Sequence, residues 1–189
     1  MNGQAGLLTD DEIDALVEKI HFNSQEESKQ ATGAAASNVD LYQVNCTYYD
    51  ALGQIDFDYL VARAIQFFAP GVPQVYYAGL LCHPNDMALL EQTNVGRDIN
   101  RPYLNLDKID TLLTKPVTRA LLRLIKIRNQ SNAFNGEFSV NSEAGVLTMA
   151  WHNNDSSATD TTGQRKRMHH RMPGRKTAIS NRLMGLLSE

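Results

Sequence analysis

Apolar residues recur at helical spacing in three parts of the chain. One stripe predicts an amphipathic helix over residues 10–21, and Thr9 and Glu12 at its start match a capping box. A broader stripe predicts a helix over residues 56–68. The third predicted helix, over residues 116–128, begins with a proline, which is preorganised for a first helical position. Shorter helical turns are predicted at 47–52, 86–91 and 107–113.

Between two of these helices lies a short stretch that predicts a buried β-strand. Val72–Tyr77 is rich in β-branched and aromatic side chains, which fit a pleated, packed surface. Pro70 and Gly71 end the preceding helix, and Gly79 opens a long polar connection. A helix, a short strand, a long loop and a further helix predict a parallel α/β fold, in which the loops after the strands carry the chemistry.

The pattern changes after residue 133. Glu137–Val140 and Val146–Trp151 flank a loop at Asn141–Gly145 and predict a β-hairpin, which would begin a small all-β region. From Asn153 onward the periodicity vanishes. Residues 153–189 are therefore expected to be disordered.

Composition places the chain among ordinary globular proteins. It has 189 residues, of which 42% are apolar and 21% charged, so one or two domains are expected. No run of eighteen apolar residues predicts a membrane span, and Met1–Leu8 lacks the features of a signal peptide. We expect a cytoplasmic protein with no membrane partner.

The net charge of −3 conceals two different parts. Residues 1–163 carry 11 Lys+Arg and 20 Asp+Glu, whereas residues 164–189 carry 7 Lys+Arg and one acidic residue. One interpretation of this basic tail is an arm that binds nucleic acid or another anionic surface. No aromatic residue interleaves it, so we expect no nucleic-acid partner. The other interpretation is an out-of-frame tail produced by a frameshift.

Reactive side chains form no known catalytic or metal-binding motif. Cys46 and Cys82 are far apart and are predicted to be free thiols in a reducing compartment. The five histidines match no metal-ligand spacing, and no phosphate loop, dinucleotide fingerprint or nucleophile elbow is present, so no cofactor is expected.

Two polar clusters remain, at Asn38–Gln43 and Gly96–Arg101. Planar polar groups that hydrogen-bond vicinal hydroxyls, beside aromatic faces that cover C–H patches, are what a sugar site needs. Solvated loops and helix caps explain the same composition, and the residues alone leave both interpretations open.

Several segments together resemble the sucrose phosphorylases of the α-amylase superfamily of retaining glycosidases and transglycosidases. The similarity covers roughly residues 8–152. The matching segments, in the family's order, are Ala31–Asn38, Val39–Asn45, Pro70–Gly79, Asn85-Asp86-Met87 and Gly96–Arg101. The resemblance implies that the chain is a C-terminal fragment of such a protein.

The resemblance implies an α/β fold: the last βα units of a (β/α)8 TIM barrel, followed by the start of a small all-β C-terminal domain and a disordered basic tail. Residues 1–55 would be the insertion after barrel strand seven, 56–133 the end of the barrel and 134–152 the start of the β-domain. Residues 153–189 would be the tail.

The family reaction transfers a glucosyl group from sucrose to phosphate with retention, and yields glucose 1-phosphate and fructose through two carboxylates. By resemblance these, and a third acidic residue, precede this chain, so no catalytic residue is assigned. The resemblance does imply substrate contacts. Asp40 and Gln43 would bind fructose, Tyr42 and the Leu41 backbone would serve phosphate, and Arg97 would hold the glucosyl unit. The intact enzyme would need no cofactor or metal and would form a homodimer.

Some residues depart from the family pattern. Cys82-His83-Pro84 and Pro102 stand where the family has other residue types. Two alternatives remain beside a sucrose phosphorylase fragment that is inactive alone. One is a fragment of a related phosphorylase for sucrose 6-phosphate or glucosylglycerate, and the other is a non-enzymatic fragment with an anion-binding tail.

Overall fold

The computed structural model describes residues 6–33, 43–154 and 156–163. The chain divides into two compact units, and it passes from one to the other three times. Unit 1 comprises Met1–Ile55 and Tyr76–Leu112, and unit 2 comprises Asp56–Val75 and Leu113–Glu189. In the described part of the chain, no helix is long and apolar enough to span a membrane.

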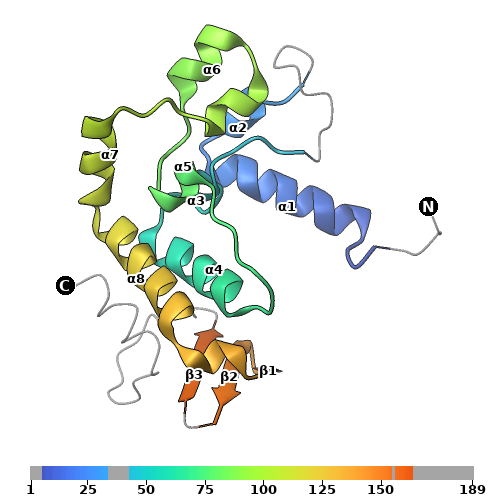
Figure 1. The fold of residues 1–189 in the computed structure, drawn as a ribbon. Coiled ribbons are helices and arrows are strands. Elements are labelled where there is room, and N and C mark those ends of the chain that lie inside the picture. The colour runs from blue at the N-terminus through green and yellow to red at the C-terminus, as the bar shows by residue number, and fades with distance from the viewer. Residues whose placement is uncertain (1–5, 34–42, 155, 164–189) are drawn as a thin grey trace, which may run out of the picture. The chain divides into compact units, whose positions relative to one another are not determined.

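Unit 1 is helical (Figure 1). The capping box predicted at its start is present, because Thr9 Oγ1 accepts from the Glu12 N–H and the Glu12 carboxylate accepts from the Thr9 N–H. The elements are α1 (Asp10–Asn23), α2 (Glu27–Gln30), α3 (Tyr48–Ala51), α5 (Tyr77–Leu80), α6 (Met87–Thr93), the 3-10 helix η2 (Gly96–Asn100) and most of α7 (Leu106–Leu113).

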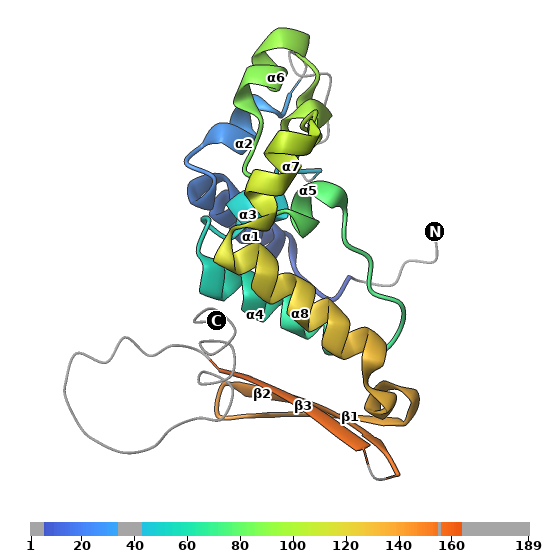
Figure 2. The same ribbon diagram turned by 60° about the vertical axis from the view of Figure 1, so that its left-hand side comes forward.

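Unit 2 combines two long helices with a sheet. Helix α4 (Asp56–Phe68) has the predicted bounds, and α8 (Pro116–Gln130) runs two residues beyond its predicted end. The two helices pack side by side (Figures 1 and 2). Their contact surfaces are apolar and buried; the buried members include Leu60, Ala64, Phe67, Val117, Ala120, Leu121 and Leu124.

The sheet of unit 2 is antiparallel, with strand order β1-β2-β3. Strand β1 (Glu137–Glu143) and β2 (Val146–Asn153) form the predicted hairpin, but the turn is shorter than expected. It consists of Ala144 and Gly145, which both have positive φ, as a two-residue hairpin turn requires. The short helix η3 (Asn132–Asn135) joins α8 to the sheet.

The third strand corrects the expectation of disorder after Asn153. Residues Ser156–Gly163 form β3, which pairs with the whole of β2. The segment lacks an apolar alternation, but its threonines favour extended backbone and its N–H and C=O groups complete the free edge of β2. The remainder of the expected tail, residues 164–189, lies outside the described residues.

The predicted strand at Val72–Tyr77 is absent. Residues 72–76 form no strand, and Tyr77 instead begins α5. Val72 is 92% exposed, not buried. A strand requires a neighbour for its backbone hydrogen bonds, and no described residue pairs with this segment. The described structure therefore contains helices with a small antiparallel sheet and no parallel strand.

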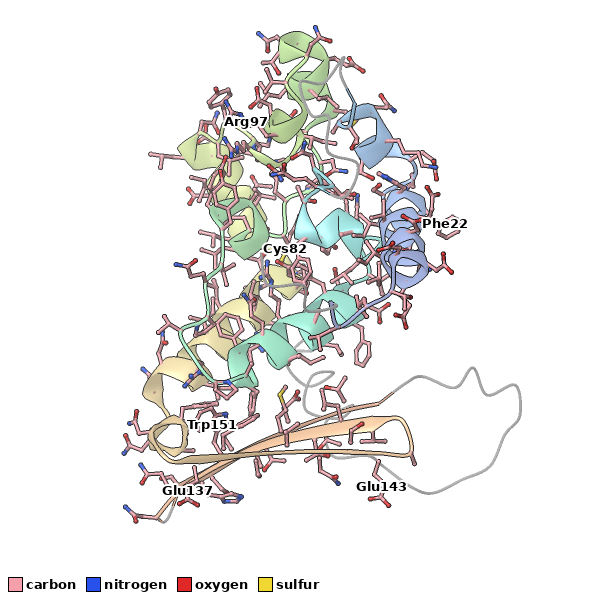
Figure 3. All side chains as sticks on the ribbon, turned by 90° about the vertical axis from the view of Figure 1, so that its right-hand side faces the viewer. Phe22, Cys82, Arg97, Glu137, Glu143 and Trp151 are labelled. Carbon is pink, nitrogen blue, oxygen red and sulfur yellow. The ribbon has the colours of Figure 1, made fainter. Side chains whose placement is uncertain are left out.

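Trp151 attaches the sheet to α4. Its indole N–H donates to the Phe68 carbonyl at 2.7 Å, and both Phe134 and Phe138 lie against its ring. The Arg128 guanidinium lies over the Phe134 ring at 4.3 Å and donates to the Gly71 carbonyl. These contacts fix the end of α8 and the chain after α4 within unit 2 (Trp151 is labelled in Figure 3).

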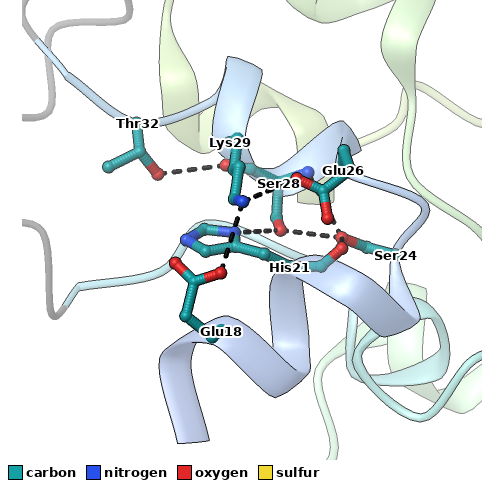
Figure 4. Close-up of polar contacts among 7 residues, drawn as sticks. All are labelled: Glu18, His21, Ser24, Glu26, Ser28, Lys29 and Thr32. Atoms are coloured by element: carbon teal, nitrogen blue, oxygen red, sulfur yellow. Dashed lines mark hydrogen bonds and ion pairs between the residues drawn. The ribbon is translucent and has the colours of Figure 1, made fainter. Parts of the chain in front are cut away.

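A buried histidine joins the first two helices of unit 1 (Figure 4). His21 Nδ1 lies 2.6 Å from Ser28 Oγ, which also lies 2.7 Å from Ser24 Oγ. Burial lowers the pKa of His21; Glu18 and Glu26 act against this shift, whereas Lys29 reinforces it. The imidazole is therefore neutral in the folded protein near pH 7.

The packing of α4 against α8 yields a first prediction. Leu121→Ala should lower the free energy of unfolding by about 2–5 kcal/mol, because Leu121 is fully buried and truncation leaves a cavity. Denaturant unfolding followed by circular dichroism measures this change. Leu122→Ala is the matched control: Leu122 is 37% exposed, and its truncation should cost no more than about 1 kcal/mol. Equal effects would contradict the described core.

His21 yields a prediction about pH. Its pKa lies below the ordinary 6.5 in the folded state, so the unfolded state binds the proton first as pH falls. The contribution of neutral His21 is fully present above about pH 6.5 and is lost as pH falls through the folded pKa. Thermal melts at pH values on both sides of this window should show a smaller acid destabilisation for His21→Gln than for the unmodified chain. Equal slopes would refute the assignment.

Candidate functional site

The structure describes two of the five predicted substrate-binding residues. Asp40, Leu41 and Tyr42 lie outside the described residues. Gln43 and Arg97 are described, and both are exposed and belong to unit 1.

Arg97 lies on η2 (Figure 3), and Ile99 of the same helix fixes the position of η2. The Ile99 carbonyl accepts from the Asp86 N–H at 2.7 Å. The Ile99 side chain is fully buried and packs with Ala31 and Leu90. The exposed Arg97 guanidinium is therefore carried by a short helix that the buried Ile99 side chain holds in place.

Two amide side chains connect the segment after Gln43 to its surroundings. Asn45 Nδ2 donates to the Ala31 carbonyl at 3.1 Å, and Asn100 Nδ2 donates to the Cys46 carbonyl at 3.4 Å. Ala31 belongs to the same apolar cluster as Ile99. Asn100 of the second polar cluster is therefore bonded to the segment that follows Gln43, and this segment and η2 both contact the apolar cluster of Ala31, Leu90 and Ile99.

Unit 1 also contains a buried polar network that the sequence did not reveal. The Asp50 carboxylate accepts from Thr47 Oγ1 at 2.7 Å, from Gln54 Nε2 at 2.7 Å and from the Asn85 N–H at 2.6 Å. The Asn85 side chain accepts from the Thr47 N–H at 2.8 Å and donates to Glu27 at 3.0 Å. The Thr47-x-x-Asp50 spacing is the one sequence signal, because Thr47 caps α3.

Asp50 is unsuited to nucleophilic chemistry. It is 3% exposed, and neutral donors occupy both carboxylate oxygens. A nucleophile needs a lone pair directed at substrate, so this carboxylate serves the structure. In the part of the chain described, no three His, Cys, Asp or Glu side chains gather into a metal-binding group.

Both cysteines are free thiols, as predicted. Burial raises the pKa of Cys46 to about 12, and hydrogen bonds from Asn85 and Ser24 act against the shift. A thiol held protonated in this way is a poor nucleophile. Cys46 therefore serves packing.

A pair of tyrosines lies at the start of α5 in the same unit. The Tyr76 and Tyr77 rings are 4.5 Å apart, and the Tyr77 hydroxyl donates to the carbonyl of the buried Pro102 at 2.8 Å. Burial, followed by the neighbouring Tyr76 hydroxyl, raises the pKa of Tyr77. Tyr77 is a neutral donor that fixes the chain just after η2.

The described groups suit the binding of a polar ligand. Guanidinium and amide donors are exposed at Arg97 and Gln43, whereas the Asp50 carboxylate of the network is buried and bonded at both oxygens. Such donors recognise hydroxyls or anionic oxygens. The arrangement can hold a polar ligand.

Comparison with known proteins identifies relatives of this chain. No family model matches it. It is 57% identical over 158 residues to a sucrose phosphorylase of Agrobacterium vitis, which covers 83% of this chain and 32% of the relative. It is 54% identical over 157 residues to a sucrose phosphorylase of Bifidobacterium adolescentis, which covers 82% of this chain and 31% of the relative.

A solved structure agrees with these relatives. The crystal structure of sucrose 6F-phosphate phosphorylase from Thermoanaerobacter thermosaccharolyticum superimposes with a TM-score of 0.73 at 34% identity, over 86% of this chain and 34% of that one. The chain thus spans about a third of the length of the curated relatives it matches. It belongs to the sucrose phosphorylase family, as the resemblance of its segments implied.

Proposed function

We propose that this chain is the C-terminal part of a retaining phosphorylase that transfers a glucosyl group from sucrose to phosphate, and that it contributes a portion of the substrate site. The observation that carries the proposal is the connection between the Gln43 segment and the Arg97 turn through Asn100 and Cys46. Identities of 54–57% to sucrose phosphorylases support it.

Within this proposal each site residue has a role. Asp40 and Gln43 bind hydroxyls of fructose, Tyr42 and the Leu41 backbone serve phosphate, and Arg97 holds the glucosyl unit. A guanidinium suits this role because its fixed N–H fork bonds neighbouring oxygens in one plane. The exposure of Gln43 and Arg97 supports contact with a ligand.

The same proposal accounts for the missing strand. The barrel of the family would have strand eight at residues 72–78, of which Tyr77 and Ala78 lie in α5 in this structure. Helix α4 would be its helix seven and α8 its helix eight, with residues 134–152 beginning the β-domain. The exposed side chain of Val72 and the absence of a pairing partner in the described structure fit a strand whose neighbours belong to other parts of the protein.

A second candidate is a related phosphorylase, with sucrose 6-phosphate or glucosylglycerate as substrate. The similarity of this chain to a solved sucrose 6F-phosphate phosphorylase supports this second candidate. Plain sucrose is preferred here because identity is higher to two sucrose phosphorylases, at 54–57%, than to a sucrose 6(F)-phosphate phosphorylase, at 47%.

A hybrid enzyme tests the proposal. The 158-residue aligned segment of the Agrobacterium vitis protein is replaced by its counterpart from this chain, and glucose 1-phosphate release is measured with sucrose or sucrose 6-phosphate. Turnover of sucrose is expected. Arg97→Ala in this hybrid should lower kcat/KM by about a hundred-fold, because loss of a positioning contact can cost that much.

The controls separate charge from position. Arg101→Ala removes another exposed positive charge, at the end of the same turn, and it should change kcat/KM far less than Arg97→Ala. A folded hybrid without activity on sucrose would sink the proposal. Preference for sucrose 6-phosphate would select the second candidate.

The isolated 189-residue chain should release no glucose 1-phosphate from sucrose and phosphate. By resemblance none of its acidic residues corresponds to the family's three catalytic carboxylates, and the one buried in the described site is fully bonded. A coupled assay for glucose 1-phosphate checks this, with the Agrobacterium vitis enzyme as positive control. Release above the buffer blank would refute the prediction.

A further inference from the structure

We propose that Asn85 is a positioning residue that sets the placement of the Arg97 turn against the segment after Gln43. The inference rests on the proposed function, because it concerns the geometry of that substrate site. Neither the resemblance nor the names of the relatives assign a role to this side chain.

One peptide group connects the two segments. The peptide between Cys46 and Thr47 is held from both sides by amide side chains. Its N–H donates to Asn85 Oδ1 at 2.8 Å, and its C=O accepts from Asn100 Nδ2 at 3.4 Å. Because a peptide group is planar and rigid, these two bonds fix the direction of the chain that leads back to Gln43.

The two asparagines are themselves connected through the backbone. The residue after Asn85 is Asp86, whose N–H donates to the carbonyl of Ile99, the residue before Asn100, at 2.7 Å. The Cys46–Thr47 peptide, Asn85–Asp86 and Ile99–Asn100 therefore form a closed ring of hydrogen bonds. Arg97 belongs to the same 3-10 helix as Ile99, so a shift in the ring moves Arg97 relative to Gln43.

Asn85 is the member of this ring that is best held in place. Its side chain Nδ2 donates to Glu27 at 3.0 Å and its backbone N–H donates to Asp50 at 2.6 Å. It is buried, with 9% exposure. Asn85 is hydrogen-bonded to α2, to the cap of α3 and to Asp50, so its position is well defined. A residue held in this way can fix the positions of the groups that it bonds.

The hydrogen bond between Asn85 and Glu27 can be broken by one substitution and restored by a second. Asn85→Asp keeps an acceptor for the Thr47 N–H but removes the donor to Glu27 and places two carboxylates together. In that variant Glu27→Gln supplies an amide donor at position 27, which can donate to the new carboxylate at position 85. The double variant Asn85→Asp/Glu27→Gln therefore restores the bond with reversed polarity.

The experiment uses the hybrid enzyme described above, since the chain spans only about a third of its relatives. The quantities measured are kcat and KM for sucrose, together with the melting temperature. Asn85→Asp should raise KM for sucrose about ten-fold or more, within the hundred-fold that a misplacement near 1 Å can cost. The double variant should recover most of this loss. Asn94→Asp, the same substitution at an exposed position of unit 1, is the control and should leave KM unchanged.

The outcomes separate this inference from the proposed function. An unmodified hybrid without turnover refutes the proposed function itself. If the hybrid is active and Asn85→Asp lowers only the melting temperature, with KM unchanged, Asn85 is structural and the inference is wrong. Where Asn85→Asp does not fold, Asn100→Ala removes the milder, half-buried bond on the other side of the same peptide. An unchanged KM in that variant overturns the inference.

Discussion

A buried carboxylate constrains unit 1. Asp50 is almost inaccessible to water, and an ionised carboxylate in such a place is costly unless it is well bonded. Donors from three different residues meet it: Thr47, Gln54 and the backbone of Asn85. Removing one would leave a buried acceptor with an unmade hydrogen bond, at a cost of at least about 1–3 kcal/mol. The segments that contain Thr47, Gln54 and Asn85 are therefore held together, and they support the candidate substrate site.

Unit 2 also contains polar groups that need hydrogen-bond partners, but they are surrounded by aromatic side chains. The rings of Phe134 and Phe138 lie against Trp151 of the sheet, and the Trp151 N–H donates to the carbonyl of Phe68 at the end of α4. A buried indole needs such a partner. The Arg128 guanidinium uses its flat face on Phe134 and an edge N–H on Gly71. Unit 2 thus depends on apolar area with a few directed bonds, whereas unit 1 depends on a polar network.

Sequence reasoning succeeded where the determining interactions are local. The capping box at Thr9, the apolar stripe of α4 and the proline at the start of α8 are each contained in one short segment, and the structure confirms all three. It failed where partners are remote. Val72–Tyr77 has strand-forming residues but no partner, and Ser156–Gly163 lacks apolar alternation but has the open edge of β2. The network joining Glu27, Asp50 and Asn85 connects positions up to 58 residues apart, which no periodicity can reveal. For the candidate site, the sequence predicts two segments, and that prediction stays a prediction; it did not reveal the bond from Asn100 to the Cys46 carbonyl.

The interleaving of the two units along the chain has a consequence for synthesis and folding. Residues 1–55 belong to a unit that is completed by residues 76–112, and residues 56–75 to one that requires residues beyond 112. As the chain leaves the ribosome, helix α4 emerges well before α8, the helix that covers its apolar face. That face stays exposed for the time needed to translate some fifty further residues, which at about 5–20 residues per second is several seconds. A nascent chain with this order depends on chaperone protection of α4 more than a chain whose units follow one another.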